Sequence, residues 1–338
     1  MLAVVTGATG HLGANLVRDL LLKGYTVRAL VRSNSRALDG LPVERVYGDV
    51  SDLKSLIKAF ENAYYVFHAA GCISIRDDEW ELLKDVNITG VANVIYACKV
   101  RNVHRLIHFS SIEALDRNAS EKQVDETFPL AMGSDHSPYA RSKAFGEELV
   151  RNAINEGLNA VILNPTSVIG PFDFKFGKAS QAIIDLVKGR LPVSVHGKAD
   201  WVDVRDVASA AISSAENAPL GERYILAGRN VSIQELDKKL EKFGRITLPK
   251  VYLPLWLIRM FVPIATLYYN LLDKEPLVTD VSLEALEGNW NISHEKAVQD
   301  LGYIPRSFDE TLNDTVEWMM DVGYLNKQLV RLADPDTI

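Results

Sequence analysis

Leu2-Ala-Val-Val-Thr-Gly-Ala-Thr-Gly-His-Leu-Gly13 lies near the start of the chain and decides the fold class. Its short apolar run is typical of a strand buried in a parallel sheet. The glycines permit a tight turn and a close approach of backbone to a pyrophosphate, and the N-terminus of the next helix offers amides to phosphates. Their place between strand and helix favours a nucleotide site over a glycine-rich turn without a ligand. The predicted contacts are Gly7, Thr9, Gly10, His11, Leu12 and Gly13.

The pattern of a strand followed by a helix repeats along the first half of the chain. Short apolar runs lie at residues 25–31, 43–50, 64–67, 105–109 and 159–163, with helical spacing between them. This alternation predicts an α/β fold with a doubly wound parallel sheet of the Rossmann type. We expect an NADP(H)-binding domain at residues 1–165, to which residues 198–228 return. A smaller, mixed substrate-binding lobe is expected at residues 166–197 and 229–338.

Side chains that can accept hydrogen bonds from a first helical turn indicate where helices begin. Ser232 and Ser307 are each followed three residues later by glutamate, which is the pattern of a capping box. Ser51 is a candidate N-cap for a helix over residues 51–60.

The end of the second strand predicts which nicotinamide nucleotide binds. A protein that uses NAD usually has an acidic residue there, which holds the ribose 2′-hydroxyl. This chain has Val31 and Arg32 at that point and Arg36 close behind. Two guanidinium groups can hold a 2′-phosphate, so the sequence favours NADP(H) over NAD(H). The alternative is a loop with two solvated arginines.

Residues after other strands predict further cofactor contacts. One pair is expected on the adenine side, and a run of small residues after the fourth strand lets backbone pass close to the cofactor. These contacts are Asp49, Val50, Ala69, Ala70, Gly71 and Asn87. For Asn87, a hydrogen bond to backbone near the site and a purely structural role are both open.

Tyr139-Ala-Arg-Ser-Lys143 carries a second functional pattern. Pro138 can open a helix, and Tyr139 and Lys143 then lie one turn apart on the same face. An ammonium beside a phenol favours the phenolate, and a phenol that titrates near neutral pH can exchange a proton with an alcohol oxygen. Moving the phenol pKa from ~10 to ~7 takes roughly 4 kcal/mol, so a second cation is expected nearby. Taken alone, the spacing also fits a solvated helix face.

Together these motifs resemble the extended short-chain dehydrogenase/reductase superfamily, also called the NAD-dependent epimerase/dehydratase superfamily. The resemblance covers nearly the whole chain. It is carried by the glycines at 7–13, Asp49, residues 69–71, Asn87, Ser110, Ser111, Tyr139, Lys143 and the segments 164–171 and 202–208. The strand that ends in Arg32 and the segment 164–171 look like dihydroflavonol-4-reductase relatives. Residues 108–113 look more like 3β-hydroxysteroid dehydrogenases.

The resemblance implies roles for the catalytic residues. Tyr139 would exchange a proton with the reacting oxygen, and Lys143 would hold the nicotinamide ribose and lower the pKa of Tyr139, with oxidised nicotinamide as the second cation. Ser111 would hydrogen-bond the reacting oxygen, with Ser110 as the alternative. The cofactor-binding residues implied are Gly7, Gly10, Gly13, Arg32, Asp49 and Pro165, and Ser167 lies in the same motif as Pro165. Residues 113–116 depart from sugar epimerases, which usually have a Tyr-Gly pair there.

Composition limits the classes of partner. The net charge of −7 argues against nucleic acid as the main partner. Cys72 and Cys98 offer neither a disulfide framework nor metal-ligand spacing, so no metal site is predicted and a reducing compartment is expected. The first residues are too short and too uncharged for a signal peptide. A cytoplasmic location is the expectation.

Residues 251–272 form the most apolar stretch, and their length approaches that of a membrane span. Pro254 and Pro263 interrupt the stretch, and Arg259 near its centre would cost roughly 2.5–3.5 kcal/mol on insertion. We expect a helix pair in the substrate lobe. Peripheral membrane contact and an apolar substrate entrance are the alternatives.

Two further features bear on the substrate and on assembly. Phe172, Phe174 and Phe176 either line a pocket for an apolar substrate or pack beneath the lobe. The helices over residues 87–100 and 138–156 predict, by analogy, a four-helix contact in a homodimer.

The sequence as a whole predicts an NADP(H)-dependent oxidoreductase. It would reduce a ketone or aldehyde on a hydrophobic small molecule, or oxidise the matching alcohol. A nucleotide-sugar epimerase or dehydratase that retains NAD is the first alternative, which Arg32 disfavours. A non-catalytic nucleotide-sensing protein is the second, which the set of Ser111, Tyr139 and Lys143 disfavours.

Overall fold

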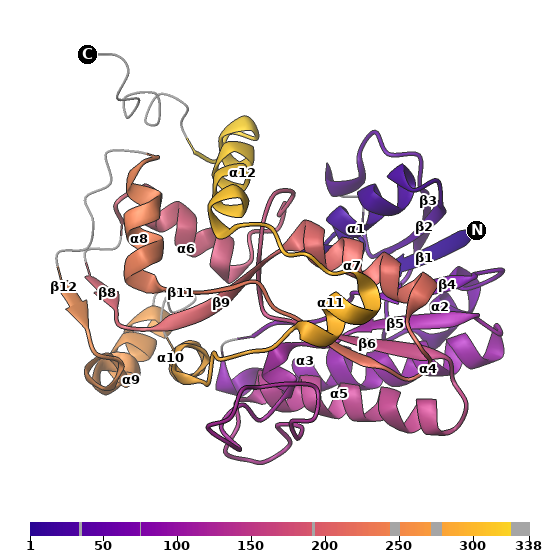
Figure 1. The fold of residues 1–338 in the computed structure, drawn as a ribbon, viewed down its shortest axis with the longest axis horizontal. Coiled ribbons are helices and arrows are strands. Elements are labelled where there is room, and N and C mark those ends of the chain that lie inside the picture. Colours follow the sequence, from indigo (N-terminus) through magenta and orange to yellow (C-terminus); the bar gives the residue numbers. More distant parts are fainter. Residues whose placement is uncertain (34–35, 75, 191–192, 244–250, 272–278, 326–338) are drawn as a thin grey trace.

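A parallel sheet of seven strands forms the centre of the larger part of the molecule (Figure 1). The computed structural model describes residues 1–338 except 34–35, 75, 191–192, 244–250, 272–278 and 326–338. The strand order is β10-β6-β5-β4-β1-β2-β3, and every neighbouring pair is parallel. These strands are β1 (Leu2–Thr6), β2 (Thr26–Val31), β3 (Glu44–Tyr47), β4 (Tyr65–His68), β5 (Arg105–Phe109), β6 (Ala160–Pro165) and β10 (Arg223–Leu226). The doubly wound sheet predicted from the alternating pattern is confirmed.

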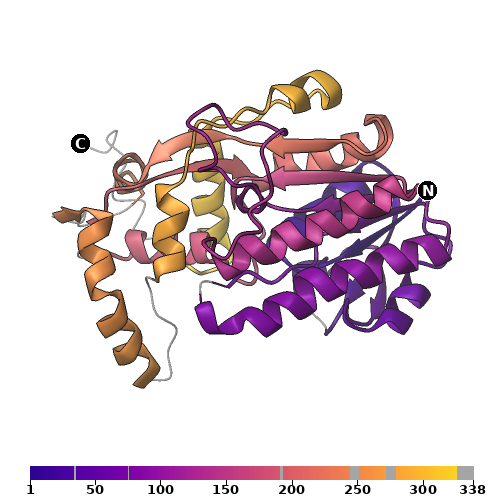
Figure 2. The same cartoon turned by 90° about the horizontal axis from the view of Figure 1, so that it is seen from below.

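Helices cover both faces of this sheet and enclose two apolar cores. On one face lie α1 (His11–Leu22) and α7 (Val204–Asn217), which pack against each other. On the other face lie α2 (Leu53–Ala59), α4 (Gly90–Val100) and α5 (Pro138–Asn155), with the short α3 (Trp80–Lys84) beside α5 (Figures 1 and 2). A π-helical turn over Asp85–Thr89 joins α3 to α4.

The smaller part is built around a mixed sheet of three strands in the order β11-β9-β7. β9 pairs parallel with β7 and antiparallel with β11. Its strands are β7 (Ser167–Ile169), β9 (Lys198–Asp203) and β11 (Arg229–Ser232), and β8 (Val193–Val195) pairs with β12 (Val251–Leu253). Around them lie α6 (Lys178–Val187), α8 (Ile233–Glu241), α9 (Leu255–Leu271), α10 (Asp280–Glu287) and α12 (Phe308–Asp321).

The chain passes between the two parts more than once. β9 belongs to the small sheet, whereas the following α7 and β10 belong to the larger part. The late helix α11 (Glu295–Leu301) also packs on α7 and β10. The predicted domain boundaries at residues 165, 198 and 228 stay a prediction. β9 departs from them, because it lies in the small sheet although residues 198–228 are expected in the larger domain.

Helix starts follow their side-chain caps. Ser232 accepts a hydrogen bond from the Glu235 amide at 3.1 Å, and Ser307 accepts one from the Glu310 amide at 3.2 Å, as both capping boxes predict. The prediction for Ser51 is wrong, because Asp52 caps α2 by accepting the Lys54 amide at 3.0 Å. The Ser51 hydroxyl donates instead to Asp49.

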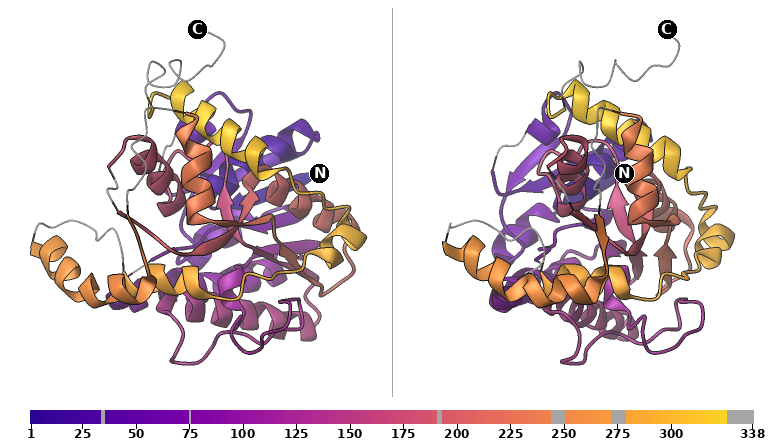
Figure 3. Two further views of the ribbon diagram at one scale, coloured as in Figure 1. Left: turned by 60° about the vertical axis from the view of Figure 1, so that its left-hand side comes forward. Right: turned by 90° about the vertical axis from the view of Figure 1, so that its left-hand side faces the viewer.

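The apolar stretch 251–272 forms β12 and then a single helix, α9, up to its last described residue, Leu271. The expected helix pair is wrong, because α9 continues through Pro263, which is exposed. Figure 3 shows α9 standing away from the body of the molecule. Among the described residues, none of the helices has the length and hydropathy needed to cross a membrane. Membrane contact through this stretch stays a prediction.

Candidate active site

Three side chains from two neighbouring elements meet at the carboxyl edge of the large sheet. β5 ends at Phe109 and leads into Ser110 and Ser111, while α5 carries Tyr139 and Lys143 on one face. The Ser111 hydroxyl lies close enough to Tyr139 to lower the pKa of its phenol. The Lys143 Nζ donates to the Phe109 carbonyl at 2.7 Å. Ser111 therefore meets Tyr139, whereas the buried Ser110 hydroxyl has no partner among the described residues.

The surroundings keep Tyr139 protonated. Burial raises the pKa of its phenol to about 12, outweighing the opposing effect of Ser111, and the charge of Glu113 raises it further. The lowered pKa expected from Lys143 is therefore not seen in this structure. A phenol that holds its proton at neutral pH is a proton donor for an oxygen that gains negative charge.

Lys143 is a buried cation below that phenol. Burial lowers the pKa of its ammonium to about 8, while the charge of Glu147 acts in the opposite direction. His68 and His108 stack nearby with ring centroids 5.4 Å apart, and burial followed by the charge of Lys143 lowers the pKa of both imidazoles. Both rings are therefore neutral, and Lys143 carries the positive charge of this cluster.

A buried ionic network, which no sequence pattern predicted, holds the backbone next to the catalytic residues. Glu147 accepts from Arg223 at 2.8 Å and from Asn164 at 2.8 Å. Asn164 also donates to the Ser111 carbonyl at 2.9 Å, so the network fixes the backbone that carries the Ser111 hydroxyl. The only sequence signal is that Glu147 lies one helical turn beyond Lys143.

The turn between β1 and α1 packs backbone closely against backbone and leaves the start of α1 without a side-chain cap. α1 begins after Gly10, which provides no side-chain cap, so the first amides of the helix lack an acceptor within it. A Cβ on Gly13 would lie 2.1 Å from the Gly7 carbonyl oxygen, and one on Gly7 would lie 2.5 Å from the Ala70 amide nitrogen. Gly7 also has a φ of 68°, which favours glycine. The residues present therefore fit a dinucleotide at this helix start.

Other predicted cofactor contacts support the site in different ways. The His11 ring donates from Nε2 to the carbonyls of Gly170 and Pro171, both at 3.1 Å. Its side chain thus ties α1 to the substrate lobe, and only its backbone lies at the helix start. Leu12 packs against the core, while Thr9 is half-buried in the turn.

Asn87 holds the loop that follows β4. Its Oδ1 accepts from the Cys72 amide at 2.9 Å, and its Nδ2 donates to the Cys72 carbonyl at 2.9 Å and to the Ser142 hydroxyl at 3.0 Å. Of the two roles left open above, the bonds to the Cys72 backbone are the first, a hydrogen bond to backbone near the site. Gly71 lies beside them, and a Cβ added there would come within 3.9 Å of the Lys143 Nζ.

Ala69 and Ala70 lie in the same loop, where their backbone meets the Gly7 turn. Val50 is buried against Gly90, so its side chain supports the site from behind. Pro165 ends β6 and Ser167 begins β7, which places both where the chain leaves the large sheet.

The residues after β2 form a cationic edge. The Arg32 side chain is 74% exposed, and its Nε lies 3.8 Å from Asp49 Oδ2. Asp49 Oδ1 accepts from the Ser51 amide and hydroxyl at 2.9 and 2.8 Å. The Arg36 guanidinium lies over the Phe174 ring at 5.4 Å from its centroid.

Three aromatic residues after β7 pack beneath the lobe. Phe174 lies edge-on to Trp318 at 5.3 Å, and Phe176 lies edge-on to Tyr324 at 4.0 Å. Phe172 belongs to the same apolar cluster. All three rings pack beneath the lobe, one of the two alternatives left open by the sequence, and Phe172 also lines a cavity of about 640 Å³ beside α1.

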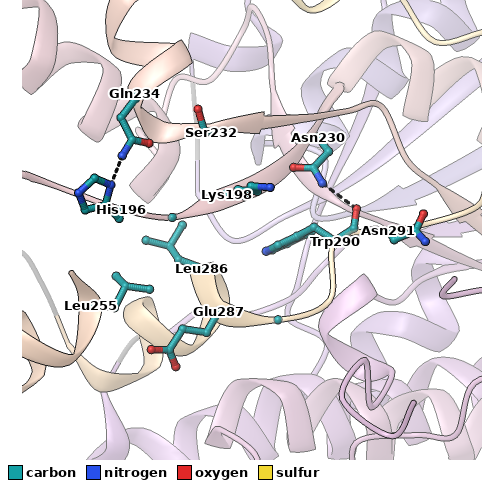
Figure 4. A pocket seen from close by; sticks show the side chains of 12 residues that line it. His196, Lys198, Asn230, Ser232, Gln234, Leu255, Leu286, Glu287, Trp290 and Asn291 are labelled. Carbon is teal, nitrogen blue, oxygen red and sulfur yellow. Dashed lines mark hydrogen bonds between the residues drawn. The ribbon is translucent and has the colours of Figure 1, made fainter. Parts of the chain in front are cut away.

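A cavity of about 530 Å³ opens in the substrate lobe between β9, β11 and the end of α10 (Figure 4). Trp290 forms part of its wall, and the Arg117 guanidinium lies 4.1 Å from the centroid of the same ring. Arg117 in turn donates to Glu113 at 2.8 Å, and Glu113 acts on Tyr139. This chain of contacts joins the cavity wall to the catalytic residues.

Both the glycine turn and the helix that carries Tyr139 fall within a match to a known protein family. The model of the NAD dependent epimerase/dehydratase family matches residues 3–227. The chain belongs to that family. Membership, together with relatives named as reductases, makes the chain an NAD(P)-dependent oxidoreductase, as the sequence predicts.

Two related proteins align with nearly the whole chain. Sterol demethylase protein B of Methylococcus capsulatus is 32% identical over 96% of this chain and 100% of its own length. A protein of Synechocystis sp. with the provisional name dihydroflavonol 4-reductase is 32% identical over 96% of both chains. The predicted resemblance to dihydroflavonol-4-reductase relatives is thereby confirmed.

Two solved structures share the fold. The structure of gox2253 superposes with a TM-score of 0.83 at 29% identity, over 96% of this chain and 99% of that one. UDP-glucose 4-epimerase of Thermotoga maritima, solved with UDP-glucose, has a TM-score of 0.74 at 21% identity, over 95% of this chain and 99% of that one. At that lower identity, the likeness shows the fold alone.

Proposed function

We propose that the chain is an NADP(H)-dependent reductase of a ketone or aldehyde on a hydrophobic small molecule, or catalyses the reverse oxidation. The observation that carries the proposal is the contact of Ser111 with a protonated Tyr139, one turn from the buried cation Lys143. The bound nicotinamide would supply or accept the hydride.

Ser111, Tyr139 and Lys143 would carry out the proton transfer. A carbonyl oxygen placed between Ser111 and Tyr139 receives a hydrogen bond from the serine hydroxyl and the proton of the phenol. Because the Tyr139 pKa lies at about 12, the phenol keeps its proton until the oxygen gains charge. Lys143 then stabilises the phenolate that remains.

Arg32 supports the preference for NADP(H). It directly follows β2, at the position where an acidic residue would hold the 2′-hydroxyl of NAD. Its contact with Asp49 is long at 3.8 Å, and its side chain is 74% exposed. A guanidinium so weakly held is free to turn to a 2′-phosphate.

An apolar substrate is supported by the residues around the site and by the relatives' names. Ile73 is 69% exposed next to Cys72, which lies near enough to Tyr139 to influence the pKa of its phenol. One relative is named a sterol demethylase protein, and another, from Stigmatella aurantiaca, is named the ketoreductase of a farnesyl dihydroquinoline oxide. Each name describes a large apolar molecule.

The test pairs a ketone and aldehyde panel with Tyr139→Phe. We expect consumption of NADPH in preference to NADH, and a loss of rate of about 10²–10⁴-fold in the variant. Nucleotide binding should stay within about twofold, because the phenol hydroxyl gives the proton and the ring keeps its place. Tyr96→Phe, an exposed tyrosine on α4, is the matched control.

Two outcomes would favour other functions. Near-stoichiometric NAD released from the denatured protein would contradict the proposal and favour an epimerase or dehydratase that retains its cofactor. A Tyr139→Phe protein with unaltered biological activity would favour the nucleotide sensor.

A further inference from the structure

A loop of the substrate lobe, residues 170–177, lies directly on the start of the cofactor helix. His11 donates to the Gly170 and Pro171 carbonyls, and Asn15 donates to the Pro171 carbonyl at 2.9 Å. The loop is therefore anchored to α1 before it returns to α6.

Two aromatic residues of this loop have left-handed backbone. The φ angles are 66° at Phe172 and 53° at Phe176. Bulky residues rarely adopt such angles, and surrounding contacts must enforce them, as often happens at functional sites. The enforcing contacts here are the rings of Trp318 and Tyr324.

Asp173 closes the same loop from inside. Its Oδ2 accepts from the Gly177 amide at 2.8 Å and from the Ser180 hydroxyl at 2.7 Å, and only 2% of the residue is exposed. Phe174 and Lys175 therefore lie in a short, fixed segment between the two residues with left-handed backbone.

The segment that holds Phe174 and Lys175 contacts the cationic edge after β2. The guanidinium of Arg36 lies over Phe174 and also over Tyr324, at 5.1 Å from its ring centroid. Lys175, the next residue after Phe174, is exposed. Partial desolvation lowers the pKa of its ammonium most, and the charge of Arg32 lowers it further, so the two cations lie close enough to repel.

Nothing in the described part of the chain pairs with the Lys175 ammonium through a hydrogen bond or salt bridge. Asp173 acts on it through space, but its Oδ2 already holds the loop closed. The chain has a net charge of −7, yet two cations are neighbours here and Lys175 has no carboxylate within salt-bridge distance among the described residues. Such a pair of cations indicates a binding site for an anion.

We propose that Lys175, supplied by the substrate lobe, and Arg32, supplied by the cofactor domain, together bind the 2′-phosphate of NADP(H). This inference rests on the proposed function, because it assumes that the nucleotide carries that phosphate. Arg32 offers a planar fork of donors, and Lys175 a compact charge from the opposite side. The amides at the start of α1 would bind the pyrophosphate, at a separate place.

The test measures binding of adenosine 2′,5′-bisphosphate and of 5′-AMP by calorimetry, with no turnover needed. Lys175→Gln should weaken the bisphosphate by about tenfold and leave 5′-AMP within about twofold. Lys175→Arg should retain most of the affinity. Lys188→Gln, at the exposed end of α6, removes the same charge from the same lobe and should change neither ligand.

The outcomes separate this inference from the proposed function. If the unmodified chain prefers the bisphosphate and Lys175→Gln keeps that preference, Lys175 is not part of the site although NADP(H) use stands. Equal weakening of both ligands would place Lys175 at the 5′-phosphate and overturn the inference. No preference in the unmodified chain would contradict both proposals.

Discussion

Lys143 shows how one residue can lower stability while it serves the site. Its ammonium is buried, with 8% of the residue exposed, and burial lowers its pKa to about 8. The unfolded chain keeps the proton up to a pKa of about 10.4, so folding releases it between these values. Stability contributed by this group therefore rises as the pH increases from about 8 to about 10.5.

Lys143→Met is expected to unfold at higher urea concentration than the unmodified chain at about pH 7. The gain should shrink by roughly 3 kcal/mol at about pH 10, because the unmodified lysine is neutral in the folded chain there. The lost hydrogen bond to Phe109 is absent at both pH values and cancels in the difference. Urea unfolding at both pH values measures the effect.

Lys188→Met provides the control, because Lys188 is exposed at the end of α6. A gain for Lys143→Met that is equal at both pH values would contradict the assigned cause.

At this scale, local patterns were informative and distant partners were not. Tyr139 and Lys143 could be recognised because four residues of helix bring them to one face. Glu147 could not be paired with Arg223, which lies 76 residues away in sequence and is brought close only by the neighbouring strands. The pKa of Tyr139 was expected to fall, because its burial and the nearby Glu113 cannot be read from spacing.

At the scale of elements, the β1–α1 turn combines a packing requirement with a binding one. Gly13 has no room for a side chain beside Gly7, whereas the closest atom to a Cβ on Gly10 would be the Gly7 oxygen at 3.3 Å. The two glycines therefore serve different purposes, although the sequence presents them alike.

Gly13→Ala is expected to lower the free energy of unfolding by about 1–3 kcal/mol, because the methyl group would overlap the backbone of the turn at Gly7 and Ala8. Gly10→Ala should unfold within about 1 kcal/mol of the unmodified chain and yet bind NADPH more weakly, because its methyl group stands at the helix start. Urea unfolding and nucleotide titration of both variants measure the difference. Equal loss of stability in the two variants would contradict it.

Element types were easier to predict than element partners. The strands of the large sheet follow from apolar runs between helices, and the two capping boxes mark the starts of α8 and α12. The pairing of β9 with β7 and β11 was not predicted, because it joins short strands across long stretches of chain. Pro263 indicated a helix end, yet it is accommodated on the exposed side of α9.

At the scale of the whole molecule, α9 exposes three large apolar side chains among the residues that the structure describes. Trp256, Met260 and Phe261 are 64%, 65% and 57% exposed. The homodimer expected through α4 and α5 stays a prediction, as does contact of α9 with a membrane surface.

For the membrane contact, we predict that the chain floats with phosphatidylcholine vesicles in a density gradient. The double change Trp256→Ser and Phe261→Ser should reduce the partition coefficient by about tenfold or more, since each 1.4 kcal/mol of lost transfer energy is a factor of ten. Leu22→Ser with Ile304→Ser removes two other exposed apolar side chains and should have no effect. A chain that never floats would rule the contact out.

The place of β10 at the edge of the large sheet also has a consequence during synthesis. β10 pairs with β6, and α7 covers α1, yet both follow the segment that builds part of the small sheet. A ribosome that has just finished Pro165 must still make the chain up to Arg223, which takes on the order of 3–12 s at about 5–20 residues per second. During that interval the part of α1 that packs against α7 has no cover. We therefore expect the nascent chain to need a chaperone at this stage, well before its last helix is made.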